Sequence, residues 1–210
     1  MLHHDRLKAV LKNMALCGLR QVIISDPGAM QYLLGQSVDA MERCGILLLR
    51  EDGRLHAFMN LLFCFSPVEG VTLHQYRDGQ NVYAMIAAEL LPGSVGIDRS
   101  WPSGHTIALM AQRSDIHPAP GSDPVDMAMA CKDAREQQLL LAAGAVNDKA
   151  IAYGISHIAP ERSEAELAQM IDDFFIASGG AQVGQYQIAC YGPNAAQPHH
   201  MPDGTLPRPG

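Results

Sequence analysis

Apolar residues in the first 120 positions recur with helical spacing in some stretches and fill short β-branched runs in others. Leu7, Val10 and Met14 follow the three-and-four spacing of an amphipathic helix. Residues 21–25, Gln-Val-Ile-Ile-Ser, are instead typical of a strand. The same patterns predict helices over residues 5–19, 27–35, 79–90 and 102–112, and strands over residues 21–25, 44–49, 55–59, 71–76, 94–97 and 115–117.

Turn and capping residues separate these elements. Asp26 and Pro27 supply an N-cap and a first-turn proline, so a helical turn is expected directly after the first strand. Asp52-Gly53 lies between two strand-like runs and is a strong hairpin signal, which predicts an antiparallel pair. Because strands and helices alternate, the predicted fold class of the first half is α/β, with a mixed sheet flanked by helices.

A proline-rich segment, residues 118–124, follows the last of these strands and predicts a domain boundary. The expected domains are residues 1–122 and residues 123–210. Three helices are predicted in the second domain. They begin at Asp123, at Asp133 and at Ser163, and the last two starts carry the acidic residue of a capping box three positions later.

The two longer helices of the second domain each have an apolar face, so both are expected to pack on something apolar. These faces consist of Leu140, Ala143, Asn147, Ile151 and Ile155 in one helix, and of Leu167, Met170, Ile171, Phe174 and Phe175 in the other. Gly179 and Gly180 then predict the end of the last helix, and residues 185–191 predict a strand.

Composition limits the classes of function. The chain has a formal net charge of -7 and scattered basic residues, which argues against nucleic acid and anionic membranes as partners. No apolar run approaches the roughly 20 residues of a membrane span, and a cytoplasmic protein is expected. The five cysteines show no C-x-x-C pair and are interpreted as buried free thiols.

Nine histidines are present, and four of them fall in the predicted strands and helices of the first domain. Each of the four is expected to stand alone, without a second ligand at metal-binding spacing, and to have a structural role only. They are His56, His74, His105 and His117. No metal site is predicted in the chain, and no glycine-rich phosphate loop follows the first strand.

His199 and His200 are different, because they are adjacent and lie in a segment broken by Pro and Gly after a predicted strand. Loops at strand ends commonly present reactive side chains. An imidazole pair needs carboxylates or further imidazoles to complete a catalytic or metal site. The pair is therefore a candidate for chemistry that depends on partners elsewhere.

Several motifs resemble one family. Residues 131–137 (Cys-Lys-Asp-Ala-Arg-Glu-Gln), 145–150, 163–167 and 192–200 (Gly-Pro-Asn-Ala-Ala-Gln-Pro-His-His) resemble the opening of the catalytic domain of the pita-bread metallopeptidases. These are the family of prolidase (Xaa-Pro dipeptidase), aminopeptidase P and creatinase. Ile23–Pro27 with the following Tyr-Leu-Leu-Gly resembles the start of their creatinase-like N-terminal domain. The resemblance implies this N-terminal domain followed by a partial α+β pita-bread domain.

The resemblance also implies roles. His199 corresponds to a catalytic histidine beside the metal centre that contacts substrate and assists proton transfer, and His200 to a substrate-binding neighbour. The family's metal ligands, two aspartates, one histidine and two glutamates, are expected after Gly210. The complete enzyme would bind two divalent ions (Mn, Co or Zn) and a proline-containing peptide, and would form a homodimer.

Three functions remain open on these grounds. The chain is the N-terminal portion of a Xaa-Pro peptidase, inactive by itself because it lacks the metal-binding residues. Alternatively, it is a free-standing dimerisation or binding module derived from that family. A third alternative is part of a creatinase-like amidinohydrolase, which shares the fold and differs in reaction.

Overall fold

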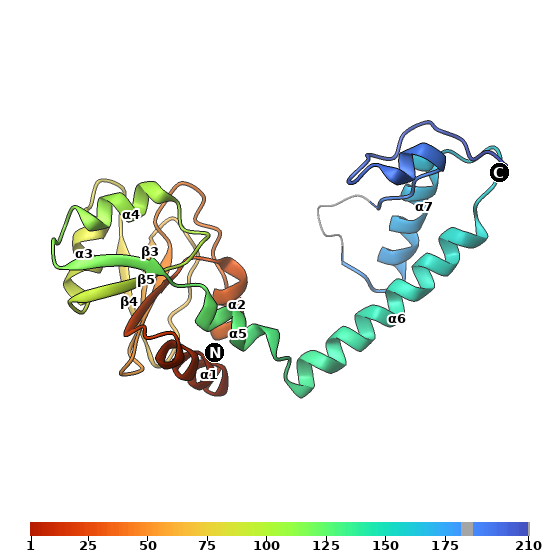
Figure 1. The fold of residues 1–210 in the computed structure, drawn as a ribbon. Coiled ribbons are helices and arrows are strands. Elements are labelled where there is room, and N and C mark those ends of the chain that lie inside the picture. The colour runs from red at the N-terminus through yellow and green to blue at the C-terminus, as the bar shows by residue number, and fades with distance from the viewer. Residues whose placement is uncertain (182–186, 210) are drawn as a thin grey trace. The chain divides into compact units, whose positions relative to one another are not determined.

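The computed structural model describes residues 1–181 and 187–209 and divides the chain into two compact units, Met1–Cys131 and Lys132–Gly210 (Figure 1). The first unit contains a six-stranded sheet with helices on both faces, so the predicted α/β class and mixed sheet are confirmed. Its strands are β1 (Gln21–Ile24), β2 (Ile46–Arg50), β3 (Leu55–Asn60), β4 (Val71–Tyr76), β5 (Gly93–Ile97) and β6 (Ile116–Pro120). Its helices are α1 (His4–Leu16), α2 (Pro27–Leu34), α3 (Val82–Glu89), α4 (Ser103–Met110) and α5 (Asp123–Ala130).

The strands lie in the order β4-β3-β2-β1-β5-β6. β2 pairs antiparallel with both β1 and β3, and Gly53 adopts a φ of 82° in the turn between β2 and β3, which confirms the predicted hairpin. β4, β5 and β6 join in parallel pairings. In the β3–β4 pair, His56 is opposite Thr72 and Phe58 is opposite His74, so both histidines lie on the same face of the sheet.

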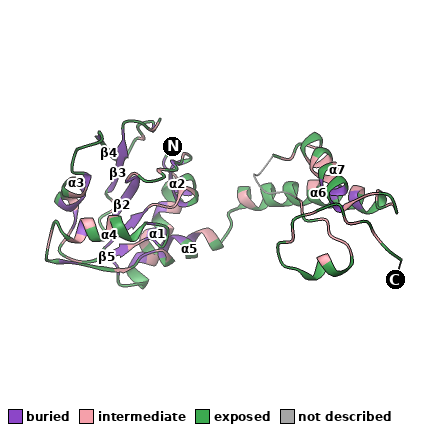
Figure 2. Cartoon of the chain, turned by 90° about the horizontal axis from the view of Figure 1, so that it is seen from above, coloured by how far each residue is buried: buried purple, intermediate pink, exposed green. Residues whose placement is uncertain are grey.

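Both faces of the sheet are buried, which explains why its central strands are almost entirely apolar (Figure 2). Leu47 and Leu49 pack with the buried residues of α1, α2 and α5, whereas Ile46 and Leu48 pack with those of α3 and α4. The alternation follows from the two-residue period of a strand. The first unit therefore has three layers, with the sheet in the middle.

Helices α2 and α3 each begin at a capping side chain. The Asp26 side chain accepts a hydrogen bond from the Ala29 N–H (2.7 Å), as the sequence predicts. The predicted start of the next helix at Gly79 is wrong, because α3 begins at Val82. Asn81 is its N-cap and accepts a hydrogen bond from the Ala84 N–H (3.1 Å).

The proline-rich segment, residues 118–124, contains regular secondary structure. Pro118 and Pro120 belong to β6, which extends past the expected end at His117. Proline is tolerated there because β6 is an edge strand paired with β5 alone. The first unit also includes residues 123–131, beyond the expected domain 1–122, since Val125 and Ala128 of α5 are buried in its core.

The second unit is built on α6 (Ala134–Ser156), α7 (Glu164–Ala177) and the short 3₁₀ helix η1 (Gly192–Ala196). Both predicted capping boxes are present, at Asp133 and at Ser163. The predicted strand over residues 185–191 is not confirmed. Its first two residues lie outside the described part of the chain, and residues 187–191 carry no strand because no described strand pairs with them.

Helix α6 packs on α7 through its C-terminal half. The ring of Tyr153 stacks on that of Phe174 with 4.3 Å between centroids, and Gly154 faces the side chain of Ile171. Much of the apolar face of α6 is exposed to solvent within the described residues, so its expected packing on an apolar surface stays a prediction (Figure 2). The exposed apolar residues of α6 are Leu139, Leu140, Leu141, Ile151 and Ile155.

Within residues 1–181 and 187–209, no helix has both the length and the apolarity needed to cross a bilayer. All five cysteines are free. The expectation that they are buried holds for Cys44, whereas Cys17, Cys64 and Cys131 are exposed and Cys190 is half-buried. Burial raises the pKa of the Cys44 thiol to about 12, which keeps it protonated near neutral pH.

Gly121, directly after β6, provides a test of the close packing of this edge. A Cβ added there would lie 2.5 Å from the backbone nitrogen of Ile97, too close for any side chain. Gly121→Ala is therefore expected to destabilise the first unit by about 1–3 kcal/mol. The measurement is chemical denaturation followed by the fluorescence of Trp101, the sole tryptophan, which is buried in this unit.

Gly104→Ala is the matched control. An added Cβ meets nothing within 4 Å at this position of α4, and alanine favours a helix over glycine by roughly 0.5–1 kcal/mol. The control should unfold at the same or a slightly higher denaturant concentration. Equal unfolding midpoints for the two variants would contradict the tight contact at Gly121.

Candidate functional site

A buried carboxylate, that of Glu164, lies at the first residue of α7 and is 0% exposed. Its position follows from the capping box just before it. The Ser163 Oγ accepts a hydrogen bond from the Glu166 N–H (3.3 Å), and the Glu166 carboxylate accepts one from the Ser163 N–H (2.9 Å). The box fixes where α7 begins, so Glu164 sits at the positive end of the helix dipole, where a carboxylate is favoured.

Glu164 holds the following loop by hydrogen bonds. Its Oε1 accepts from the Tyr191 N–H (2.6 Å), both of its oxygens accept from the Asn194 side-chain amide (3.2 Å each), and Oε2 accepts from the Asp203 N–H (3.3 Å). The backbone adds to this attachment, because the Glu164 N–H donates to the Thr205 carbonyl (3.1 Å). These hydrogen bonds attach the loop of residues 191–205 to the start of α7 near both of its ends.

The two histidines predicted as site residues lie in this fastened segment. His199 is exposed and adopts a φ of 59°, a left-handed conformation that is uncommon for residues other than glycine. His200 is half-buried, and its Nε2 lies 3.3 Å from Oε2 of Glu164 and 3.7 Å from Oδ2 of Asp203. His199 thus faces solvent, whereas His200 is held against two carboxylates.

The surroundings of His200 are negatively charged. Hydrogen bonds from Thr205 hold the pKa of Asp203 below its usual value, so that carboxylate is ionised near neutral pH. Burial, together with the charge of Glu164, raises the pKa of the Tyr191 hydroxyl and that of the Cys190 thiol. Tyr191 and Cys190 are therefore neutral groups beside a pair of carboxylates.

A cleft of about 940 Å³ opens beside this cluster, lined by Pro160, Tyr191, Asn194, Thr205 and Leu206 among others. Three of the residues that line it, Tyr191, Asn194 and Thr205, are hydrogen-bonded to Glu164. The cleft is wide enough for a small peptide. Its lining residues do not include His199 or His200.

The described residues of this unit, 132–181 and 187–209, do not fit a two-metal hydrolytic centre. Glu164, His200 and Asp203 bring three ligand-type atoms within 4.8 Å of one another. However, the oxygens of Glu164 already accept hydrogen bonds from Tyr191, Asn194 and Asp203. Two ions that share a hydrolytic centre need several further oxygen or nitrogen ligands.

The prediction that each of the four histidines of the first unit stands alone is wrong for His56 and His74. His105 is paired with the Tyr83 hydroxyl (2.7 Å), and burial lowers its pKa. His117 is exposed on β6. His56 and His74, by contrast, lie side by side with their ring nitrogens 3.0 Å apart, and Glu89 lies beside them.

Sequence reasoning missed Glu164 as the residue that organises the loop. The signal was present, since Glu164 lies inside the Ser163–Glu166 capping box, but the box indicated only a helix start. Asn194 lies in the motif of residues 192–200, where the sequence indicates no role for it, and Asp203 is not among the predicted site residues. Their convergence on one carboxylate depends on a chain reversal that local patterns do not encode.

Comparison with known proteins points to one family. Residues 138–210 match the model of metallopeptidase family M24. The probable dipeptidase PepE of Mycobacterium bovis is 26% identical over 203 residues, which cover 93% of this chain and 54% of that protein. The chain therefore spans about half the length of the curated relatives it matches.

Solved structures agree on the fold. The dipeptidase PepE from Mycobacterium ulcerans matches with a TM-score of 0.81 and 24% identity, over 98% of this chain and 57% of its own. The prolidase from Thermococcus sibiricus matches with a TM-score of 0.82 and 24% identity, over 100% of this chain and 59% of its own. The resemblance to the pita-bread metallopeptidases and the expected fold class are thereby confirmed, with only part of the relatives covered.

Glu164→Gln tests whether the buried carboxylate holds the loop. The amide retains the shape but replaces one acceptor oxygen by a donor that faces N–H groups, so the loop should lose about 1–3 kcal/mol of local stability. Hydrogen exchange should show faster exchange at the amides of Tyr191 and Asp203. Glu161→Gln, at an exposed position, is the control and should leave these amides unchanged. Unchanged protection in Glu164→Gln would contradict the role given to this carboxylate.

Proposed function

We propose that this chain is the N-terminal part of a metal-dependent peptidase that hydrolyses Xaa-Pro dipeptides. The observation that carries the proposal is the M24 match over residues 138–210, which includes the anchored His199-His200 segment. The names of the relatives, a probable dipeptidase and a prolidase, supply the substrate class. The residues that bind the divalent ions, whether Mn, Co or Zn, would then lie outside these 210 residues.

His199 is the proposed catalytic histidine. Its side chain is exposed on a loop whose two ends are tied to α7, so the imidazole is presented to solvent from a fixed base. An imidazole can donate a proton to a scissile amide or accept one from it near neutral pH. The left-handed backbone of His199 is consistent with this role, because unusual backbone conformations cluster at functional sites.

His200 is the proposed substrate-binding neighbour. The two carboxylates beside it, those of Glu164 and Asp203, supply negative charge near its ring. A peptide substrate carries a positively charged amino terminus, which such a surface attracts. In this arrangement Glu164 is a positioning residue that acts through the loop.

The exposed apolar face of α6 also supports a larger protein. Leu140 is 57% exposed, Ile151 50% and Ile155 66%, and they repeat along one helix over four turns. A contiguous apolar face of this kind marks a surface that another body covers. We assign it to the rest of the metallopeptidase domain.

Two alternatives remain. A free-standing dimerisation or binding module would cover the same α6 face with a second copy of the chain, and the homodimer expected from the resemblance stays a prediction. A creatinase-like amidinohydrolase would keep the fold and change the reaction. The first alternative is distinguished by what covers α6, and the second by the substrate.

The peptidase activity of the 210-residue chain can be compared with that of a longer polypeptide that continues past Gly210. The 210-residue chain should hydrolyse no Xaa-Pro dipeptide when Mn or Co is added separately, because the ligands of the proposed two-ion centre would lie outside it. The longer polypeptide should be active, and His199→Ala in it should lower kcat by about 100-fold, since general acid–base catalysis contributes that order of rate. Steady-state kinetics with a Xaa-Pro dipeptide measure both.

His117→Ala, at an exposed position of β6, is the matched histidine control and should keep the original kcat. His200→Asn should raise KM more than it lowers kcat. Metal-dependent turnover by the 210-residue chain would overturn the proposal, and so would an unaltered kcat in His199→Ala. Turnover of creatine in place of the dipeptide would favour the amidinohydrolase.

Hydroxyl-radical footprinting tests what covers the exposed apolar face of α6. Oxidation of Leu140 and Ile151 should be several-fold lower in the longer polypeptide than in the 210-residue chain, because the rest of the domain covers them. Ile107 of α4, 69% exposed, is the control and should be oxidised equally in both. Equal oxidation of Leu140 in both lengths would contradict the assignment. Protection that rises with the concentration of the 210-residue chain would instead favour the dimerisation module.

A further inference from the structure

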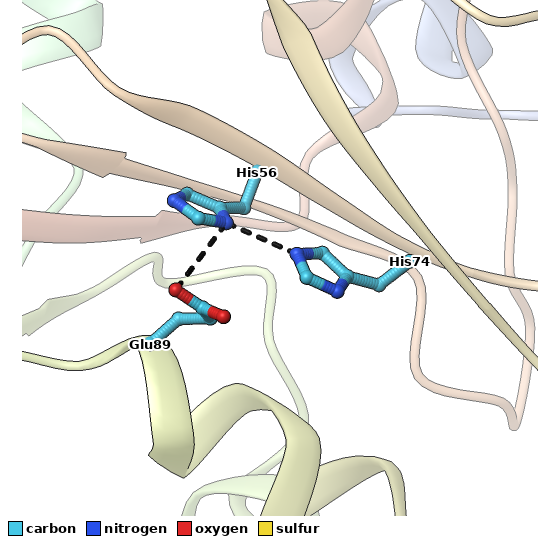
Figure 3. A group of neighbouring side chains, drawn as sticks. All are labelled: His56, His74 and Glu89. Carbon is cyan, nitrogen blue, oxygen red and sulfur yellow. Dashed lines mark hydrogen bonds and ion pairs between the residues drawn. The ribbon is translucent and has the colours of Figure 1, made fainter.

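The first unit brings two imidazoles and a carboxylate together on the face of the sheet that α3 and α4 cover. His56 lies on β3 and His74 on the neighbouring parallel strand β4. Glu89 is the last residue of α3 and extends toward the His56 ring (Figure 3). The three residues come from three different elements, so their approach is a product of the tertiary fold.

Their nitrogen and oxygen atoms converge on one point. Nδ1 of His56 lies 3.0 Å from Nε2 of His74 and 3.8 Å from Oε2 of Glu89, and all three atoms lie within 4.8 Å of one another (Figure 3). Two nitrogens bound to one zinc ion at about 2.0–2.1 Å and a tetrahedral angle are about 3.3 Å apart. The observed separation of 3.0 Å between the two imidazole nitrogens is a few tenths of an ångström shorter than this spacing.

The scaffold holds these rings in place. His74 stacks on Phe58 with ring centroids 4.4 Å apart and an interplanar angle of 7°, and His56 is nearly parallel to His74 at 5.3 Å. Phe58 is fully buried in the core. Because Phe58 fixes the plane of His74, the site needs little ordering when an ion binds.

The cluster is closed on one side and open on the other. The side chain of His56 is 8% exposed, whereas that of Glu89 is 34% exposed and His74 is half-buried. An ion can therefore enter from the side of Glu89 and His74. The same opening leaves room for water as a further ligand.

The local charges permit a cation. Arg50 and Arg54 are the nearby cations, and Glu89 opposes them. Arg50 is itself paired with Asp52 (3.3 Å) and donates to the backbone carbonyl of Glu89 (3.3 Å), which leaves the Glu89 carboxylate for a ligand.

We propose that His56 Nδ1, His74 Nε2 and a carboxylate oxygen of Glu89 form a binding site for one zinc ion. Two imidazoles and one carboxylate are ligands that suit zinc and similar transition ions better than magnesium or calcium. Each ring remains neutral when bound and carries its proton on the outer nitrogen, Nε2 in His56 and Nδ1 in His74. The site is in a different unit from His199 and does not depend on the proposed peptidase function.

The test is zinc titration of the tag-free 210-residue chain by calorimetry, with chelator competition to set the free zinc concentration. The chain should bind one equivalent at this site, and His74→Gln and Glu89→Gln should each weaken that binding by at least about tenfold. His117→Gln removes an exposed histidine from the same unit and should bind as the original chain does. His200→Gln removes the histidine of the second cluster and should also retain the binding.

Thermal unfolding followed by Trp101 fluorescence provides a second measurement. Zinc should raise the Tm of the first unit in the original chain and in His117→Gln, and should leave the Tm of His74→Gln unchanged. Without zinc, all variants should melt close to the original chain. The proposal is overturned if the original chain binds no zinc, if His74→Gln binds as tightly, or if only His200→Gln loses binding.

Discussion

The second unit depends on the hydrogen bonds that the buried carboxylate of Glu164 accepts. This carboxylate joins the first turn of α7 to Tyr191, Asn194 and Asp203, which enclose His199 and His200 in sequence. A buried carboxylate is costly unless its oxygens are satisfied, and here N–H donors and the positive end of a helix satisfy them. The capping box at Ser163 fixes where α7 begins, and this places the Glu164 carboxylate. The hydrogen bonds to that carboxylate then position the segment that contains the two histidines of the proposed function.

Features with a local cause were predicted well. The Asp26 cap, the Asp52-Gly53 hairpin and the two capping boxes were all identified from neighbouring residues, and the structure contains them. Features that depend on distant segments were not. The packing of α5 into the first unit and the extension of β6 through Pro118 depend on partners far away in sequence, and the convergence on Glu164 depends on a chain reversal.

The zinc site illustrates the same limit. His56 and His74 are 18 positions apart, and only the parallel register of β3 and β4 brings them to one face of the sheet. Glu89 joins them because α3 packs over that face and ends there. Within the described residues, imidazole and carboxylate groups thus come together once in each unit. The Glu164 carboxylate already accepts hydrogen bonds from N–H donors, whereas the Glu89 carboxylate lies beside two imidazole rings.

Under the proposed function, these 210 residues are the N-terminal part of a longer metallopeptidase. The most direct measurement is the intact mass of the native polypeptide, captured from its own cells with an antibody against residues 1–131. The chain spans only 54% of the matching dipeptidase. We therefore expect a native polypeptide of nearly twice 210 residues, with ligand-type residues after Gly210. A native polypeptide that ends at Gly210 would contradict it and would favour the free-standing module.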